Sequence, residues 1–417
     1  MKNNKYFTIG VFRMFLIGIC GKTNCGKTTY FCAATLVDAE ISNRIFTTIE
    51  PNKGVGYVTA PCPCKQLGVQ CQPQNSKCVN GTRLIPIRLI DVAGLVPGAH
   101  AGRGLGNQFL SDIMEAHALV HVVDASGGTD SGGNPVAPGT HDPMEDVLFL
   151  EQEIDLWILG ILKKNFEALK RKAEAAHQKL DEVIYKQLSG LGITHEDVRN
   201  AMRHVDISGS PEGGLPHPRP VTEDDMLRFI NMLRKKAKPM IIAANKIDMP
   251  SAEKGLARLK ETEVSSVPCS AECELALRRA EREGDIEYVP GAKDFRLIKQ
   301  DLEPRKMAAL RIVRERVLDR FGSTGVQQCL NEAVFRLLGM RVVYPVEDET
   351  HFRSGKGHVL PDAYLVPAGT TPRQLAGMIH TDFAEKFMAA VNARTKLRVA
   401  ADYELKDGDI IKIMLRR

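Results

Sequence analysis

The feature that most constrains this chain is residues 21–28, which read G-x-x-x-x-G-K-T. An apolar run at residues 14–20 precedes the motif, and residues 29–36, which have helical character, follow it. A phosphate-binding loop requires this strand–loop–helix context. Converging backbone N–H groups and the start of a helix bind phosphate at such a loop. The chain is therefore expected to fold around a nucleotide site on an α/β sheet.

Two side chains of this loop have defined chemistry. Lys27 is expected to reach the β- and γ-phosphates, and the Thr28 hydroxyl is expected to bind Mg²⁺. Because the loop holds phosphate mainly through its backbone, its neighbours belong to the site as well. The residues expected to bind the nucleotide here are Asn24, Cys25, Gly26, Lys27, Thr28 and Thr29.

A D-x-x-G motif follows the predicted strand at residues 84–90. Asp91 at the strand end is expected to hold Mg²⁺, usually through water, and the Gly94 N–H is expected to contact the γ-phosphate. The glycine-rich residues 95–106 then predict a mobile second switch. Leu95 stands where Ras-like GTPases place the glutamine that orients the attacking water, and an apolar side chain cannot do this. Catalysis must therefore use another group, a metal ion or a partner protein.

A threonine lies about twenty residues beyond the phosphate loop, as in GTPase first switches. Thr48, within residues 46–52, is expected to bind Mg²⁺ and sense the γ-phosphate. A β-branched pair that enters a strand has the same pattern, so this alternative stays open.

The base-recognition motif is N-K-x-D, which follows a predicted buried strand at residues 239–244. The carboxylate of Asp248 can accept hydrogen bonds from N1–H and the 2-amino group of guanine. Adenine has no donor at either position and would leave a buried charge unpaired, so we expect GTP to bind in preference to ATP. A further strand at residues 264–269 leads to a backbone contact with guanine O6. The residues of this part of the site are Asn245, Lys246, Asp248, Ser270 and Ala271.

A cysteine-rich loop separates the first switch from the D-x-x-G strand. It has no strand or helix periodicity, and its cysteine spacing, C-x-C-x6-C-x6-C, is not that of a standard zinc finger. Ligand type and number fit zinc, while the alternative is an ordinary loop with free thiols. The candidate zinc ligands are Cys62, Cys64, Cys71 and Cys78.

Composition excludes few classes of protein. A chain of 417 residues, 43% hydrophobic and 26% charged, is expected to form about two or three globular domains. The net charge of +5 is compatible with RNA but too small to argue for it. No apolar run approaches the ~18 residues of a membrane span. Ten scattered cysteines beside a nucleotide site favour a reducing, cytoplasmic environment.

Two histidines lie near the predicted site. His121 falls inside a predicted buried strand at residues 118–124 and is expected to be a core residue. His141 ends the Gly- and Pro-rich loop 125–142; it is expected to be a surface histidine before a helix, although it could approach the phosphates.

Long charged helices are predicted between residues 143 and 236, with Thr222 capping the last of them. Their excess of lysine most often marks a solvated face, and contact with RNA is the alternative. From residue 341 onward the pattern becomes β-rich and suggests a small ubiquitin-like β-grasp module.

Several segments together resemble the YchF/Obg-like family of GTPases, and most of all its archaeal branch. They are residues 46–52 (FTTIEPN), 91–106 (DVAGLVPGAHAGRGLG), 107–110 (NQFL), 319–325 (DRFGSTG), 379–383 (IHTDF) and the terminal DYELKDGDIIKI. The resemblance covers nearly all of residues 14–417. It implies a P-loop NTPase G domain, with a mostly parallel sheet flanked by helices, a helical insertion and a C-terminal TGS domain.

The resemblance also implies site roles and partners. By position, Thr48 matches the family's first-switch threonine and Leu95 its hydrophobic replacement for the catalytic glutamine. Asn24 matches the asparagine that helps hold K⁺ near the phosphates in related GTPases, where the cation would supply positive charge. The expected catalytic residues are Lys27, Thr48, Gly94 and Asn24, with Mg²⁺ at Thr28, Thr48 and Asp91.

The domain organisation expected from these patterns has five parts. They are an N-terminal extension (1–13), the first part of the G domain (14–144), the helical insertion (145–237), the second part of the G domain with connecting helices (238–340), and the TGS-like domain (341–417). Met14 could itself be a start, so the extension is expected to be dispensable.

The predicted function is GTP hydrolysis by a cytoplasmic, ribosome- or RNA-associated switch, with no membrane or DNA partner. GTP or GDP and Mg²⁺ are the expected cofactors, with K⁺ and Zn²⁺ as further candidates. Many members of the family depart from N-K-x-D and prefer ATP, so an ATPase of the same build is one alternative. A nucleotide-regulated RNA- or ribosome-binding scaffold with incidental hydrolysis is the other.

Overall fold

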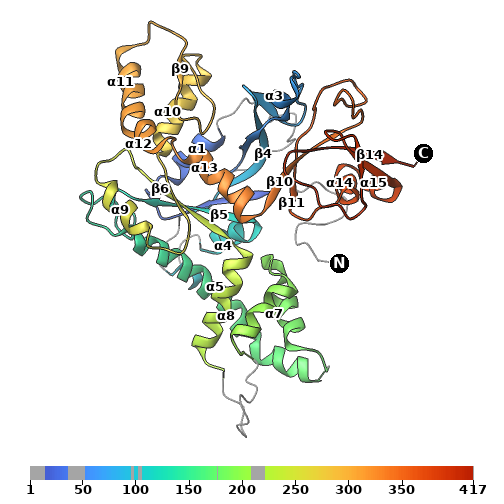
Figure 1. The fold of residues 1–417 in the computed structure, drawn as a ribbon. Helices are drawn as coiled ribbons and strands as arrows, with labels where there is room; N and C mark the ends of the chain where they lie inside the picture. Colours follow the sequence, from blue (N-terminus) through green and yellow to red (C-terminus); the bar gives the residue numbers. More distant parts are fainter. Residues whose placement is uncertain are drawn as a thin grey trace. The chain divides into compact units, whose positions relative to one another are not determined.

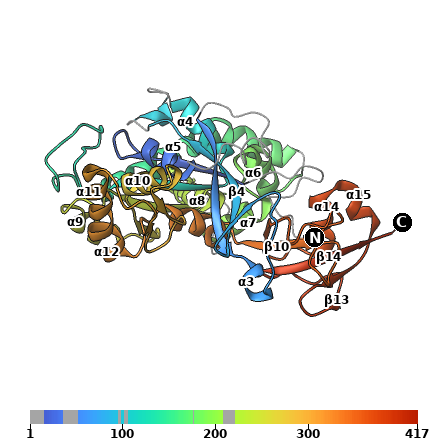
Figure 2. The ribbon, with the colours of Figure 1, turned by 90° about the horizontal axis from the view of Figure 1, so that it is seen from above.

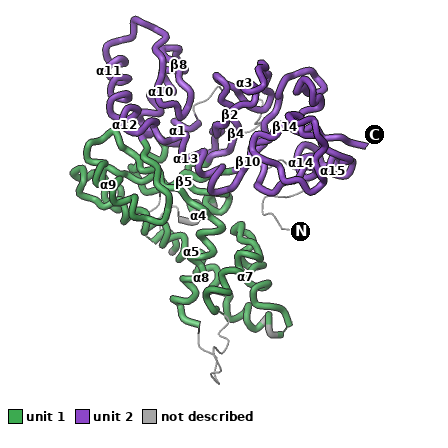
Figure 3. Tube along the Cα trace, viewed as in Figure 1, with its two compact units in different colours: residues 1–5, 16–28, 90–269 green, residues 6–15, 29–89, 270–417 purple. Residues whose placement is uncertain are grey.

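The structure is a computed structural model that describes residues 15–35, 52–94, 98–101, 106–175, 177–207 and 221–416. Figures 1 and 2 show its ribbon from two directions. The chain divides into two compact units, coloured green and purple in Figure 3. The first unit contains the described residues of 16–28 and 90–269, and the second contains those of 6–15, 29–89 and 270–417.

The first unit is built on parallel strands that lie side by side in the order β1, β5, β6, β7. Their bounds are β1 (Leu16–Cys20), β5 (Ala118–Asp124), β6 (Met240–Asn245) and β7 (Ser266–Pro268). Every residue of β1, β5 and β6 is buried, which explains why each is a continuous apolar run. In register, Asp124 lies beside Asn245, so β5 and β6 end at one edge of the sheet. The parallel α/β sheet predicted from the sequence is confirmed.

Helices surround this sheet and extend away from it. The first unit contains α4 (Gly106–Glu115), α5 (Pro143–Ala175), α6 (Leu180–Leu188), α7 (His195–His204), α8 (Glu223–Ala237) and α9 (Ala252–Leu259), and α1 (Lys27–Thr35) begins in it. Capping boxes at Thr194 and Thr222 start α7 and α8. One apolar cluster runs from Leu16 and Phe109 through Ile154 and Phe229, so α5 and α8 share a core with the sheet (Figure 1). The predicted helices, including the cap at Thr222, are confirmed.

The second unit opens with β2 (Lys53–Pro61), β3 (Lys77–Val79) and β4 (Thr82–Asp91), whose last two residues belong to the first unit. A short helix, α3 (Pro63–Leu67), precedes β3. Elements near its middle are α10 (Ala271–Arg282), β8 (Ile286–Glu287), β9 (Arg296–Leu297), α11 (Pro304–Val313), α12 (Asp319–Phe321) and α13 (Val326–Asn331). Two π-helical turns, Arg314–Leu318 and Glu332–Leu337, continue α11 and α13.

The C-terminal part of the second unit is a five-stranded sheet in the order β11-β10-β14-β12-β13. The strands are β10 (Met340–Val346), β11 (Tyr364–Pro367), β12 (Phe387–Asn392), β13 (Leu397–Val399) and β14 (Asp409–Leu415). Only β10 and β14 pair in parallel. Helix α14 (Pro372–Ile379) packs Leu375 into the core of this sheet beside Val343 and Ile411, and α15 (Thr381–Lys386) follows it (Figure 2). The predicted β-grasp module is therefore confirmed.

Two expectations about local structure are wrong. The cysteine-rich loop was expected to lack regular structure, but it contains α3 and β3, because Pro63 begins a helical turn that Gly68 ends in the left-handed conformation. His141 does precede a helix, but its side chain is only 8% exposed and contacts Asp146, so it is not a surface residue. Within the described residues, no helix is both long enough and apolar enough to cross a membrane.

Candidate nucleotide-binding site

The phosphate loop takes backbone conformations that few residues allow. Gly21 and Gly26 have φ of 147° and 99°, and a Cβ at Gly21 would lie 2.4 Å from the Val122 carbonyl oxygen. Asn24 has φ of 58°, in the left-handed region that asparagine tolerates better than most residues. The glycines of the motif are therefore required by the path of the loop between β1 and α1.

The Thr28 hydroxyl meets the carboxylate at the end of β4. Its Oγ1 donates to Asp91 Oδ2 at 3.0 Å. The Val92 N–H donates to the Ile19 carbonyl and holds this strand end beside β1. Asp91 Oδ1 is buried and has no hydrogen-bond partner among the described residues. Burial raises the pKa of Asp91, against the opposing effects of Thr28 and Lys27. A hydroxyl and a carboxylate with a spare buried oxygen suit Mg²⁺, which prefers oxygen ligands.

Lys27 is only 8% exposed and bonds back onto its own loop. Its Nζ donates to the Lys22 carbonyl oxygen at 2.9 Å. A Cβ added at Gly94 would lie 3.5 Å from Lys27 Nζ, so the D-x-x-G glycine and the loop lysine are neighbours. The structure therefore brings the two predicted phosphate-contacting residues together.

The N-K-x-D motif is joined directly to the phosphate loop. Asn245 Nδ2 donates to the Cys25 carbonyl at 2.9 Å, and Lys246 Nζ donates to the Asn24 carbonyl at 3.0 Å. Lys246 has φ of 69°, and Asp248 lies two residues further on and is half-buried. The ends of β6 and the loop after β1 thus form one site.

Asp124, at the end of β5, is a site residue that the sequence analysis missed. Its Oδ2 accepts from Lys246 Nζ at 2.7 Å and from Thr129 Oγ1 at 2.9 Å, and Ser126 donates to its Oδ1. Burial would raise the pKa of Asp124, but the bonds from Lys246 and Ser126 outweigh it, and the pKa is lowered. Its position at the end of an apolar strand, like that of Asp91, was the signal that could have identified it.

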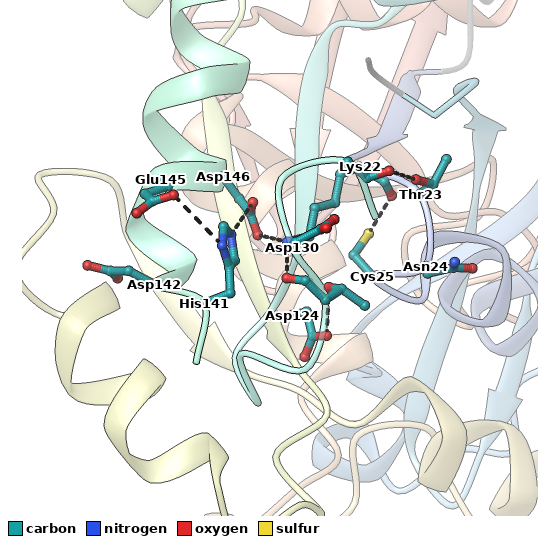
Figure 4. A network of polar contacts seen from close by, with 12 residues as sticks. Lys22, Thr23, Asn24, Cys25, Asp124, Asp130, His141, Asp142, Glu145 and Asp146 are labelled. Atoms are coloured by element: carbon teal, nitrogen blue, oxygen red, sulfur yellow. Dashed lines mark hydrogen bonds and ion pairs between the residues drawn. The ribbon is translucent and has the colours of Figure 1, made fainter. Parts of the chain in front are cut away.

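A second set of charged residues lies beside the phosphate loop (Figure 4). The Lys22 and Asp146 side chains are 2% and 3% exposed and form an ion pair of 2.8 Å. Lys22 Nζ also donates to the Thr129 carbonyl, and His141 Nε2 lies 2.8 Å from Asp146 Oδ1. Breaking a buried pair of this kind leaves an uncompensated charge and is strongly destabilising. The pair therefore anchors the loop to the start of α5.

The segment after the D-x-x-G motif is held by Glu153 of α5. Its carboxylate accepts from the backbone N–H groups of Gly98 and His100, each at 2.9 Å, and lies 2.7 Å from His100 Nδ1. Burial would raise the pKa of Glu153, but the two amides and His100 lower it. Part of the predicted second switch is therefore attached to a rigid helix.

Two residues near the site are neutral. Burial, with the charges of Lys22 and Lys27, lowers the pKa of His121 to about 3, which confirms that His121 is a core residue. Burial raises the pKa of the Cys25 thiol to about 11, so this phosphate-loop cysteine is not a thiolate.

The remaining predicted residues fall into three groups. Thr48 and Leu95 lie outside the described residues. Thr29 in α1, with Ser270 and Ala271 at the start of α10, belongs to the second unit. There the Ser270 N–H donates to the Thr324 carbonyl at 2.8 Å. The four cysteines of the predicted zinc loop do come together, with their Sγ atoms within 4.8 Å of one another.

This geometry defines a class of protein. A strand–loop–helix phosphate loop, a D-x-x-G carboxylate and an N-K-x-D motif that contacts the loop make up a P-loop nucleotide-binding domain of the GTPase type.

Family models match along most of the chain. The "50S ribosome-binding GTPase" model matches residues 16–142, and the "Obg-like GTPase YGR210-like, G4 motif-containing domain" model matches residues 243–348. The TGS domain model matches residues 356–415.

Individual relatives align with this chain over nearly its full length and over nearly their own. An uncharacterized GTP-binding protein of Methanocaldococcus jannaschii is 51% identical over 403 residues, which cover 96% of this chain and 99% of the relative. The solved structure of a GTP-binding protein from Pyrococcus horikoshii is 41% identical, with a TM-score of 0.75 over 96% of this chain and 100% of that one. The ribosome-binding ATPase YchF of Escherichia coli O157:H7 is 27% identical over 425 residues, covering 96% and 99%. The chain belongs to the YchF/Obg-like family of GTP-binding proteins.

Proposed function

We propose that this chain binds GTP in preference to ATP and hydrolyses it slowly to GDP and phosphate. The observation that carries the proposal is the bond from Asn245 Nδ2 to the Cys25 carbonyl, 2.9 Å long. It ties the intact N-K-x-D motif to the loop that would hold the phosphates. Asp248, at the end of that motif, would accept both guanine donors, which ATP lacks.

Hydrolysis would proceed by in-line attack of water on the γ-phosphate. Thr28 and Asp91, with Thr48, would hold Mg²⁺, which neutralises charge on the β- and γ-phosphates. Lys27 Nζ now donates to the Lys22 carbonyl, and would exchange this partner for a phosphate oxygen when nucleotide binds. The Gly94 N–H would donate to the γ-phosphate. Leu95 cannot orient the water, which is why we expect slow intrinsic turnover.

Asn24 is proposed to help place a monovalent cation beside the phosphates. Its Nδ2 donates to the Gly133 carbonyl at 2.9 Å, which fixes the direction of the amide. A cation there would add positive charge where the transition state develops negative charge.

The test of base preference is a competition titration with a fluorescent GTP analogue displaced by unlabelled GTP or ATP in Mg²⁺. We expect GTP to displace the analogue at a concentration at least tenfold lower than ATP, since adenine would leave the Asp248 carboxylate without hydrogen-bond donors, at a cost of about 1–3 kcal/mol. Equal displacement would favour the ATPase alternative, which is motivated by the E. coli relative's name, ribosome-binding ATPase.

The proposed partner is the ribosome, in the cytoplasm. The proposal rests on the names of a matching family model and of a relative, which both include ribosome binding. A second candidate function is a ribosome- or RNA-binding scaffold, favoured by the C-terminal TGS module. GTP turnover in potassium with and without ribosomes separates the two: stimulation supports the switch. Unchanged turnover, together with cosedimentation that depends on GTP, supports the scaffold.

A further inference from the structure

The four cysteines of residues 62–78 converge on one point although their spacing matches no standard motif. The Sγ atoms of Cys62 and Cys71 lie 3.9 Å apart, as do those of Cys64 and Cys78. All four atoms lie within 4.8 Å of one another. Sulfur atoms bonded to one tetrahedral zinc at about 2.3 Å must lie about 3.8 Å apart. The observed separations are thus close to those of a single tetrahedral metal ion.

The local fold explains how such irregular spacing gives this geometry. Cys62 precedes α3 and Cys64 lies in its first turn, so one helical turn presents both. The Val69 N–H donates to the Cys64 carbonyl at 3.0 Å as the chain turns back through Gly68. Cys78 comes from β3, which an Asn80–Gly81 turn joins to β4, and the Cys62 N–H donates to the Gly81 carbonyl at 2.8 Å. Backbone hydrogen bonds therefore bring the helical turn and the hairpin together around the thiols.

A buried cation beside the cluster is a second, independent observation. Arg83 is fully buried and lies opposite Cys78 in the β3–β4 ladder. Its guanidinium donates to Ser76 Oγ at 3.0 Å and to the Leu360 carbonyl at 2.8 Å. Its Nε has no hydrogen-bond partner among the described residues, and the partly buried Asp362 is a carboxylate on which its charge acts. Burying a charge is costly unless it is well paired. Zinc held by four thiolates carries a net negative charge and would add to the balance of Arg83.

We propose that Cys62, Cys64, Cys71 and Cys78 form a structural Zn²⁺ site. Four thiolates in tetrahedral arrangement leave no open position, so the metal would have a structural role and none in hydrolysis. Separations this short suit one ion better than a multi-iron cluster, whose thiolates attach to different metal atoms.

The zinc would fix the segment that docks on the C-terminal domain. The Gln72 and Gln74 N–H groups donate to the Val359 and Pro361 carbonyls at 2.8 and 2.7 Å. Asn75 exchanges two hydrogen bonds with the Ala363 backbone. These residues lie between Cys71 and Cys78, so the metal restrains both ends of the docking segment. Loss of zinc should therefore free residues 72–76 from residues 359–363.

The first experiment measures metal content of the full-length protein, expressed without added chelator, by elemental mass spectrometry. We expect about one zinc per chain, and a Cys64→Ser variant that keeps less than a tenth of it. Cys32→Ser is the matched control, since Cys32 is a partly exposed thiol outside the cluster, and it should keep full zinc. Absence of zinc from the unmodified protein, or zinc retained by Cys64→Ser, overturns the proposal.

The second experiment needs no variant and does not depend on nucleotide turnover. Hydrogen exchange is followed before and after removal of metal with a strong chelator, and again after zinc is restored. The peptide that covers residues 72–76 should lose protection and then regain it, while the peptide of β5 stays protected. No change on chelation contradicts the structural role. Intact mass and visible absorption complete the test, because disulfides or bound iron at the four cysteines would each refute a zinc site.

Discussion

Asn245 and Cys25 are joined by a hydrogen bond of 2.9 Å between residues that lie 220 positions apart in the sequence. The amide of the base-recognition motif donates to the backbone of the phosphate loop. The Asn245 amide also packs against Gly26, where an added Cβ would lie 2.3 Å from Asn245 Nδ2. The proposed base-recognition and phosphate-binding motifs thus share one contact, and two of the expected outcomes below concern it.

Replacement of Asp248 tests base recognition. Asp248→Asn removes the charge proposed to accept from guanine N1–H and the 2-amino group, so GTP affinity should fall by about tenfold to a hundredfold, as expected for loss of charged hydrogen bonds. The asparagine amide can instead donate to the 2-oxo group of xanthine, so affinity for XTP should rise. Competition titration measures both. Glu253→Gln on the exposed side of α9 is the control, and unchanged GTP affinity in Asp248→Asn would contradict guanine recognition by this residue.

Substitutions at two glycines distinguish the effect of steric contact from the effect of backbone strain in the loops of the site. A Cβ at Gly26 would lie 2.3 Å from Asn245 Nδ2 at φ of 99°, whereas Gly139, with φ of 83°, has open space around it. Gly26→Ala should therefore reduce nucleotide affinity more than tenfold. Gly139→Ala should only lower the free energy of unfolding, by about 1–2 kcal/mol. Calorimetric titration with GTP and thermal unfolding measure the two effects. If Gly26→Ala and Gly139→Ala lost equal GTP affinity, backbone strain alone would explain the loss in both variants.

His121 should make stability depend on pH. Its folded-state pKa is about 3 because it is buried near Lys22 and Lys27, whereas the unfolded chain has an ordinary histidine. Between these values the unfolded state binds one more proton, so stability falls as pH falls. From pH ~6.5 to ~5, above the range of most carboxylates, we expect a loss of about 1.5–2 kcal/mol.

The check on this effect is His121→Leu, which removes the titrating ring and keeps an apolar side chain of similar size. Denaturant unfolding at several pH values should give a flatter profile for the variant across that window. If the free energy of unfolding of His121→Leu depended on pH as steeply as that of the unmodified protein, His121 would not be the source of the pH dependence.

Replacement of Asn24 tests the proposed site for a monovalent cation. GTP turnover should be faster in potassium than in sodium, and Asn24→Gly should bring the two rates together. Glycine is the appropriate replacement because Asn24 has φ of 58°, which glycine adopts without strain. GTP affinity of the variant serves as the control, and should change by only a few-fold. Equal rates in the two salts for the unmodified protein would remove the proposal.

The sequence by itself determined the parts of this protein whose signals are local. The G-x-x-x-x-G-K-T loop, D-x-x-G and N-K-x-D each follow an apolar run, because parallel strands buried on both faces must be apolar throughout. The cap at Thr222 was predictable from short-range side-chain and backbone chemistry. These local signals therefore predicted which motifs form the candidate site, although not the part that Asp124 takes in it.

Tertiary structure alone decided which distant groups meet. Lys22 and His141 both contact Asp146, and Glu153 holds Gly98 and His100, through contacts between segments that no sequence period relates. The cysteine-rich loop is a further contact that the local pattern did not predict. Its spacing is not that of a standard zinc finger, yet a helical turn and a hairpin bring its four Sγ atoms within 4.8 Å of one another. Long-range packing fixes such contacts, because burial of one charge or thiol depends on everything that surrounds it, and a local pattern does not contain that information.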